Sequence, residues 1–270
     1  MLIRLNKSLV ALALAALACN AHAHRPWLLP SSTLVEAKDP WVTVDAAISE
    51  NLFDIDHQPL KLDALLITGP DGSRVTPENL FSGRLRSTFD IKLAKPGTYK
   101  ASIVTHSVMA SYKLNGEMKR WRGTEATFSS EIPAGAQEVQ ATRVLSRLET
   151  FVSAGKPNET VFKPLGEGLE LFPVTHPNDL RVGEKATWRF LLDGKAAPHL
   201  PFSLVPGGVR YRGVLGEIRL STDANGEISF TVPAAGMYLL NASWPAAVTG
   251  GQAPPARRVT YAATLEVLPQ

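Results

Sequence analysis

The sequence predicts an all-β protein made of two sandwich domains in tandem. The chain of 270 residues consists of short β-prone runs separated by proline, glycine, asparagine and aspartate, and no long stretch has a 3.6-residue apolar period. Turn signals recur at roughly 8–12 residues, the strand spacing of sandwiches and barrels. Together these observations favour a β-sandwich over a helical or α/β fold.

The N-terminal segment, residues 1–23, has the pattern of a secretory signal peptide. Arg4 and Lys7 form a positive start, and the apolar run Ser8–Ala18 that follows has about half the length of a membrane span. Ala21–Ala23 fits the small-x-small cleavage rule. We expect cleavage after Ala23, a periplasmic mature protein and no stable membrane insertion. An uncleaved N-terminal anchor is the alternative.

The number of cysteines and the net charge further restrict the functional class of the protein. Cys19 is the only cysteine and lies inside the segment expected to be removed, so the mature protein would have neither disulfide nor thiolate ligand. Lipidation of Cys19 is the alternative, although alanine stands where leucine is usual, three residues earlier. Cleavage would leave 26 basic against 25 acidic residues. This balance argues against nucleic-acid binding.

The first domain is expected over residues 24–135. Asn115-Gly116 lies between two alternating runs and predicts a type I′ hairpin. Gly69–Gly72 predicts a turn between strands. The strands expected in this domain are 41–46, 63–68, 88–93, 98–104, 111–114, 117–121 and 127–132.

Residues 136–167 are expected to be a linking segment containing one strand, at 144–152, and residues 168–270 a second domain. About seven strands fit the second domain, as an immunoglobulin-like or transthyretin-like sandwich requires. Asp223–Gly226 predicts a sharp hairpin between two of them.

Sequence motifs of catalysis are missing. The chain has no G-x-S-x-G elbow, H-E-x-x-H, P-loop or G-x-G-x-x-G sequence. Asp54 and Asp56 are two residues apart, which suits a turn or ligand loop better than an acid–base pair. We therefore expect a binding protein and no enzyme.

Histidine at the new N-terminus is the main chemical signal. Cleavage after Ala23 would give His24 a free amine beside its ring Nδ1, a bidentate clamp for Cu(II) or Ni(II). Cleavage after Ala21 would instead give His22-Ala23-His24, whose amine, backbone nitrogens and imidazole suit the same ions. Trp27 could pack beside this terminus or anchor the first strand.

Strand alternation adds two histidines to this candidate site. In antiparallel order, the loop carrying His57 and the end of the strand before His106 return to the rim that holds the N-terminus, with Met109 nearby. Three imidazoles and an amine suit nickel or copper, with zinc as an alternative. His176 and His199 are interpreted first as structural side chains.

A family resemblance is carried by residues 24–30, 56–60, 69–72, 120–123, 168–179, 192–195, 222–226 and 261–267. Together these segments resemble a known family of bacterial periplasmic proteins of formally unknown function, often labelled a periplasmic component of nickel or cobalt uptake. The resemblance spans nearly the whole mature chain and implies a β-sandwich fold and a link to divalent metals. It supports His24 and His57 and adds His176, whereas His106 rests on topology alone.

Three functions follow as hypotheses. The leading one is a periplasmic protein that binds nickel, cobalt or copper and passes the ion to a membrane metal transporter. The second is a non-catalytic structural or interaction module of the cell envelope. The third is an enzyme that oxidises substrates at an N-terminal copper site.

Overall fold

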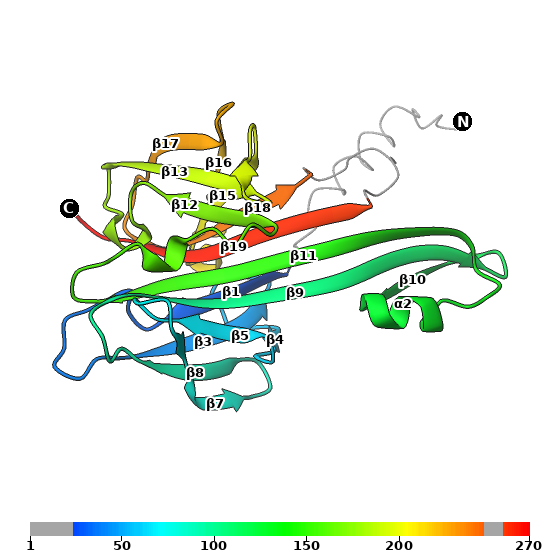
Figure 1. Cartoon of the computed structure of the whole chain (residues 1–270), viewed down its shortest axis with the longest axis horizontal. Coiled ribbons are helices and arrows are strands. Elements are labelled where there is room, and N and C mark those ends of the chain that lie inside the picture. The colour runs from blue at the N-terminus through cyan, green and yellow to red at the C-terminus, as the bar shows by residue number, and fades with distance from the viewer. Residues whose placement is uncertain (1–23, 246–255) are drawn as a thin grey trace, which may run out of the picture.

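A computed structural model describes residues 24–245 and 256–270, which form three stacked β-sheets (Figure 1). The all-β prediction is confirmed. The expected signal peptide, its cleavage site and Cys19 lie outside the described residues. None of the described helices is both long and apolar enough to cross a membrane.

The outer sheets cover opposite faces of a ten-stranded central sheet. The N-terminal layer has five strands: β1 (Arg25–Pro30), β3 (Trp41–Ser49), β4 (Gln58–Pro59), β7 (Glu78–Ser82) and β8 (Ser87–Lys92). The C-terminal layer has four: β12 (Leu169–Pro173), β13 (Lys185–Leu192), β14 (Lys195–Ala196) and β17 (Glu227–Thr231).

The central sheet takes strands from both halves of the chain. Its main path runs β16-β15-β18-β19-β11-β9-β5-β6, with β10 paired to β9 and β2 paired to β11. Its strands are β2 (Leu34–Val35), β5 (Leu65–Thr68), β6 (Arg74–Val75), β9 (Gly97–Leu114), β10 (Glu117–Gly123), β11 (Gln137–Ala154), β15 (Pro201–Pro206), β16 (Ile218–Ser221), β18 (Gly236–Trp244) and β19 (Arg257–Val267). The short helices are α2 (Glu125–Glu131), α3 (Val209–Arg212), η1 (Thr160–Phe162) and η2 (Pro177–Asp179).

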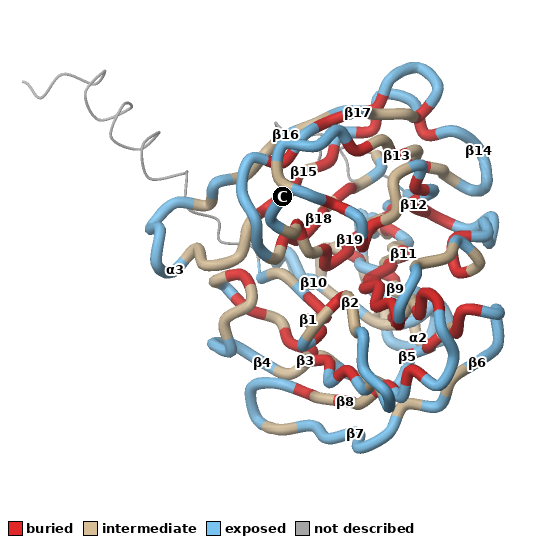
Figure 2. Tube along the Cα trace, turned by 90° about the vertical axis from the view of Figure 1, so that its left-hand side faces the viewer, coloured by how far each residue is buried: buried red, intermediate tan, exposed pale blue. Residues whose placement is uncertain are grey.

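The position of strand β11 differs from the one expected when the sequence was divided into two domains joined by a linking segment. It occupies most of the expected linking segment, residues 136–167, yet it pairs antiparallel with β9 and parallel with β19. Because side chains alternate along a strand, Leu145 and Phe151 enter the C-terminal core while Leu148 and Val152 enter the N-terminal core. The two sandwiches therefore share one sheet, and Figure 2 shows buried residues concentrated where the layers meet.

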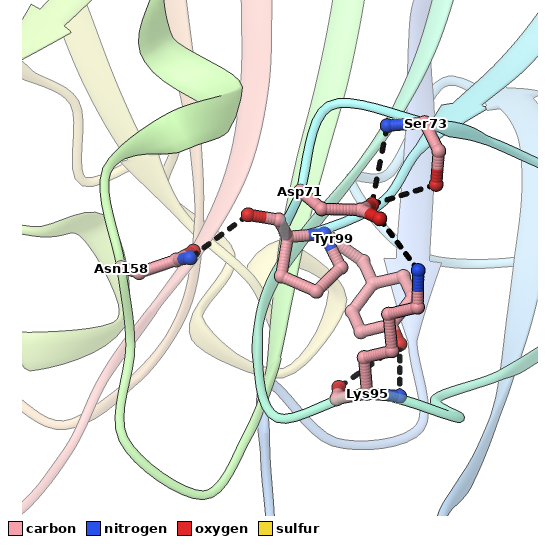
Figure 3. Close-up of polar contacts among 6 residues, drawn as sticks. Asp71, Ser73, Lys95, Tyr99 and Asn158 are labelled. Carbon is pink, nitrogen blue, oxygen red and sulfur yellow. Dashed lines mark hydrogen bonds and ion pairs between the residues drawn. The ribbon is translucent and has the colours of Figure 1, made fainter.

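The remainder of the expected linker is also fixed. Asn158 accepts a hydrogen bond from the Thr98 amide at 3.0 Å and donates its own amide to Thr98 Oγ1 at 3.1 Å, while its Nδ2 donates to Pro70 O at 2.9 Å. Figure 3 shows Asn158 reaching the turn that also carries Asp71. A hydrogen bond from Lys95 holds the pKa of Asp71 well below its usual range.

An arm formed by β9, β10, α2 and β11 projects beyond the sandwich body (Figure 1). The predicted hairpin is confirmed, since β9 pairs with β10 and both Asn115 and Gly116 have positive φ. The strand expected at 127–132 is wrong, because α2 forms there. Thr124 and Thr127 make a reciprocal capping box at its start, which satisfies amides that a helix start leaves free.

The turn at Asp223–Gly226 is present, but the hairpin expected there is wrong. The preceding β16 pairs with β15 in the central sheet, whereas the following β17 pairs with β13 in the C-terminal layer. The turn residues determine the local bend, whereas the packing of the two layers determines which sheet the strand on each side of the turn joins.

A charged cluster lies buried between the central and C-terminal layers. Glu149 accepts a hydrogen bond from Tyr261 Oη at 2.8 Å, and its other carboxylate oxygen is 3.6 Å from Lys100 Nζ and 3.7 Å from Arg147 Nη1. Arg147 Nη2 donates to Glu167 O at 3.0 Å. Burial raises the pKa of Tyr261 well above its usual value, so its hydroxyl remains a donor.

A second buried network joins β9, β11 and η2. His176 Nδ1 accepts from the Asn178 amide at 3.0 Å, which assigns the ring proton to Nε2, and Nε2 lies 3.0 Å from Thr98 Oγ1. Thr98 and Ser153 are linked at 2.9 Å, and Ser153 donates to Asn178 Oδ1 at 2.8 Å. Burial lowers the pKa of His176, because the protonated ring would lose its hydration there.

Replacing Glu149 by leucine should destabilise the protein by about 3 kcal/mol, since it leaves two buried cations without their carboxylate. Tyr261→Phe, which removes one hydrogen bond, should cost about 1 kcal/mol. Urea unfolding followed by circular dichroism measures both. Equal free energies of unfolding for Glu149→Leu and wild type would contradict the role given to this cluster.

The His176 network predicts a stability that falls as the solution is acidified. The pKa of His176 is lowered from 6.5 on folding, so the unfolded chain binds the proton more readily. The free energy of unfolding should therefore decrease as the pH falls below 6.5. His176→Gln should flatten this part of the stability profile, with His199→Asn as the control. An unchanged profile in His176→Gln would refute the assignment.

Candidate functional site

The start of the described chain and the loop after β3 lie side by side. Strands β1 and β3 are antiparallel with Arg25 opposite Ser49, so His24 and Glu50 continue beyond the same pair. The chain then returns through β4, which pairs with the end of β3. The intervening loop, residues 50–57, is therefore held at both ends by the N-terminal layer, next to His24.

Trp27 fixes the beginning of this loop. Its indole is fully buried, and Nε1 donates to Ser49 Oγ at 2.8 Å. Ser49 Oγ in turn donates to Asn51 O at 2.8 Å. The ring of Phe53 packs edge-on against Trp27, with 5.7 Å between centroids. Trp27 thus anchors the first strand, one of the two roles considered for it from the sequence, and it also supports the loop.

Asp56 folds the end of the loop back onto its beginning. Its carboxylate accepts hydrogen bonds from the amides of Glu50 and Asn51, each at 3.0 Å, and from Asn51 Nδ2 at 3.2 Å. Asp56 is thereby used as a turn residue, as the spacing of the two aspartates suggested. The closure carries the next residue, His57, over the ring of His24.

His24 and His57 form a stacked pair of imidazoles. Their ring centroids are 3.9 Å apart, and the ring planes differ by 9°. His24 Nε2 is 3.3 Å from Glu50 Oε1. Both the His24 and Glu50 side chains are about half exposed. The site therefore combines two imidazoles and one carboxylate at an accessible rim.

This donor set suits a late first-row divalent ion. Imidazole nitrogen is a common ligand of nickel, copper, cobalt and zinc, and a carboxylate completes many such sites. In the arrangement described, the rings stack instead of pointing their nitrogens at one position. Among residues 24–245 and 256–270, no three His, Cys, Asp or Glu side chains already converge as a metal cage. Binding would require the exposed rings to rotate.

Asp54 lies on the side of the loop that faces α3. Its Oδ2 is buried and has no hydrogen-bond partner within the described part of the chain, and the nearest cation is Arg210 Nη1 at 3.9 Å. The Phe53 ring lies against Gly207, where an added Cβ would come within 2.8 Å of Phe53 Cδ2. The histidine loop therefore packs directly onto the segment between β15 and β16.

His106 does not join this pair. The strand end expected just before His106 is wrong, because β9 continues to Leu114 and leaves His106 in mid-strand. Its neighbour Val104 on the same face packs towards the C-terminal core, and His106 Nε2 is 3.0 Å from Glu167 Oε1. His106 therefore faces the C-terminal side of the central sheet, whereas the stacked pair belongs to the N-terminal layer. Met109 lies further along the arm.

The remaining histidines are also separate from the stacked pair. His176 is committed through both ring nitrogens to the buried network with Asn178 and Thr98. His199 is exposed in the turn before β15. Sequence reasoning named His24 and His57 but missed Glu50, whose only signal was its position immediately after the strand that precedes the histidine loop.

Comparison with known proteins identifies the family. Residues 21–246 match a family described as a domain of unknown function, DUF4198, so the chain belongs to that family. No curated protein matches the sequence.

Two solved structures align with most of the chain. The D0–D1 domain of intimin is 12% identical, with 89% of this chain and 97% of that chain covered and a TM-score of 0.22. Escherichia coli alpha-2-macroglobulin activated by porcine elastase is 11% identical, with 91% of this chain and 31% of that chain covered and the same TM-score, 0.22. The chain thus spans less than a third of the macroglobulin.

Asp56→Ala should loosen the histidine loop without unfolding the sandwich. The loss of its hydrogen bonds to two amides should lower the free energy of unfolding by about 1 kcal/mol. The NMR resonances of the His57 ring should show exchange broadening that is absent from wild type. Asp63→Ala, at another exposed aspartate, is the control. Sharp, unshifted His57 resonances in Asp56→Ala would contradict this account of the loop.

Proposed function

We propose that this protein binds a divalent transition-metal ion, nickel, cobalt or copper, in the periplasm and delivers it to a membrane metal transporter. The ion is cargo in this proposal, and no catalysis is involved. The observation that carries the proposal is the stacking of His24 on His57 beside Glu50. Residues far apart in the sequence supply these donors at one exposed rim.

Export would complete the site chemically. Cleavage after Ala23 would free the His24 amine, which with the adjacent ring Nδ1 makes a chelate to which His57 adds a second imidazole. A site of three nitrogens and a nearby carboxylate binds Ni(II) and Cu(II) well, and Co(II) less tightly in the usual affinity order. The resemblance of residues 24–30 and 56–60 to proteins labelled for nickel or cobalt uptake supports the same assignment.

The partial exposure of the site suits a carrier. A half-exposed ion can be exchanged with a second protein, whereas a structural ion is normally enclosed by four protein ligands. The rings must rotate before they can chelate, and this keeps the affinity below that of a preformed cage. Both properties favour transfer over permanent retention.

An interaction module of the envelope is the second candidate. The arm of β9, β10, α2 and β11 extends from the body (Figure 1). Met109 and Met118, which lie on this arm, are exposed. Such a projection could dock onto a partner without any metal. Co-purification with an envelope partner by a chain that binds no divalent ion would favour this candidate.

His57→Ala should weaken metal binding by at least tenfold, because it removes one of two imidazoles from the site. Mature protein purified from the periplasm is measured first by denatured and native mass spectrometry, which give the N-terminus and the bound metal. Titration calorimetry with Ni(II), Co(II) and Cu(II) then gives the affinities.

His106→Ala is the matched control, because it removes an exposed histidine that is also paired with a glutamate but faces the other side of the central sheet. Its affinities should equal those of wild type. Unchanged affinity of His57→Ala for all three ions would overturn the proposal, as would equal losses in the two variants.

A further inference from the structure

A groove of ≈ 530 Å³ lies on the central sheet beyond the cover of the N-terminal layer. It is formed by β15, β16, β18 and β19. Ser203, Asn241 and Thr260, which line it, alternate along their strands with residues of the C-terminal core, so they face the N-terminal side. Nearer the centre of that sheet, Val205 and Leu239 on the same face are buried in the N-terminal core.

Polar side chains stand in two rows on the floor of the groove, which also has apolar lining residues. In one row across the sheet, Ser203 is paired with both Arg219 and Asn241, and in the next row Ser243 is paired with Thr260. Hydroxyl, amide and guanidinium groups thus stand where a buried sheet would carry valine or leucine. This pattern suits a small ligand rich in hydrogen-bond acceptors.

The charge of the groove is positive. Arg258 donates to Ser243 Oγ at 3.2 Å and has no carboxylate partner among the described residues, while Arg219 is 2.8 Å from Glu217. Burial would raise the pKa of Glu217, but hydrogen bonds from Arg219 and Ser203 and the nearby charges of Arg219 and Arg25 lower it overall. Two guanidinium groups, those of Arg219 and Arg258, and one carboxylate, that of Glu217, therefore line the groove.

The segment that leads into one strand of the groove also contacts the histidine loop. Arg25, whose charge acts on Glu217, directly follows His24 in the chain. From the other side, Phe53 of the histidine loop packs on Gly207, and Asp54 approaches Arg210. Gly207 and Arg210 belong to the segment that leads from β15 to Glu217 and β16. The same loop therefore connects the stacked histidines with the wall of the groove.

We propose that the groove binds the organic part of a metal chelate, a small polycarboxylate held by Arg219 and Arg258 whose ion is bound by His24 and His57. This inference rests on the proposed function and specifies its substrate class. Guanidinium groups recognise carboxylates, and the serine, threonine and asparagine side chains supply further donors. The imidazoles replace water molecules on the chelated ion, and no covalent bond changes.

The test compares three probes on mature protein: Ni(II) as the aquo ion, a 1:1 complex of Ni(II) with citrate, and citrate alone. Arg258→Gln should bind the aquo ion as wild type does and the citrate complex at least tenfold more weakly. Arg219→Gln, at a second exposed arginine, should show the same selective loss. Arg120→Gln is the control, since it removes an exposed arginine on the distant arm.

The outcomes separate this inference from the proposed function. Unchanged affinity of both groove variants for the citrate complex would overturn the proposal that the groove binds the organic part of the chelate. The same proposal would be overturned if citrate only withdraws nickel from the wild-type protein. Binding of citrate alone that weakens in Arg258→Gln but not in His57→Ala would support the groove. Unchanged aquo-ion affinity in His57→Ala would instead overturn the metal site itself.

Discussion

Pairing of β11 with a strand from each half of the chain organises the whole structure. On one side β11 forms a long antiparallel ladder with β9, and on the other it runs parallel to β19 near the C-terminus. Its alternating side chains fill two cores, so neither outer layer could keep its packing if this strand moved. Non-local pairing of this kind costs chain entropy, which the burial of two apolar faces on one sheet offsets.

The buried polar groups reinforce the same strand. Glu149 links β11 to β9 and β19 through Lys100 and Tyr261, and Ser153 links it to η2 through Asn178. Such groups stabilise a structure only when each finds its partners, so they also exclude alternative registers. The linker that follows β11 is tied to the turn at Pro70, which makes the two sandwiches one continuous body.

The candidate metal site depends only indirectly on the pairing of β11 with its neighbouring strands. His24 and His57 meet because β1 pairs with β3 and because Trp27, Ser49 and Asp56 hold the loop in place. The same loop leans on the segment between β15 and β16, a part of the second half of the chain. Packing between the N-terminal layer and the shared sheet thus places the histidine loop against the segment that leads to the groove.

The sequence by itself determined the features that depend on neighbouring residues. Alternating runs specified strands, and Asn115-Gly116 specified a tight turn because both residues accept positive φ. His24 and His57 could be paired from the sequence because the antiparallel strand that precedes the His57 loop returns the chain to the rim where the first strand began. The position of His106 could not be obtained in this way, since nothing local to Thr105 signals that β9 continues.

Tertiary structure alone decided which strands share a sheet. The segment 144–152 has the same alternating pattern whether it links two domains or lies in a sheet between two layers. The alternation shows that the strand has two distinct faces, but it does not show which elements pack against each face. Likewise, the Ser203 row and the arginines beside it could be seen as a groove only after four strands had been aligned in register. Local preferences are set by chain chemistry, whereas the register of distant strands is set by how well their faces pack.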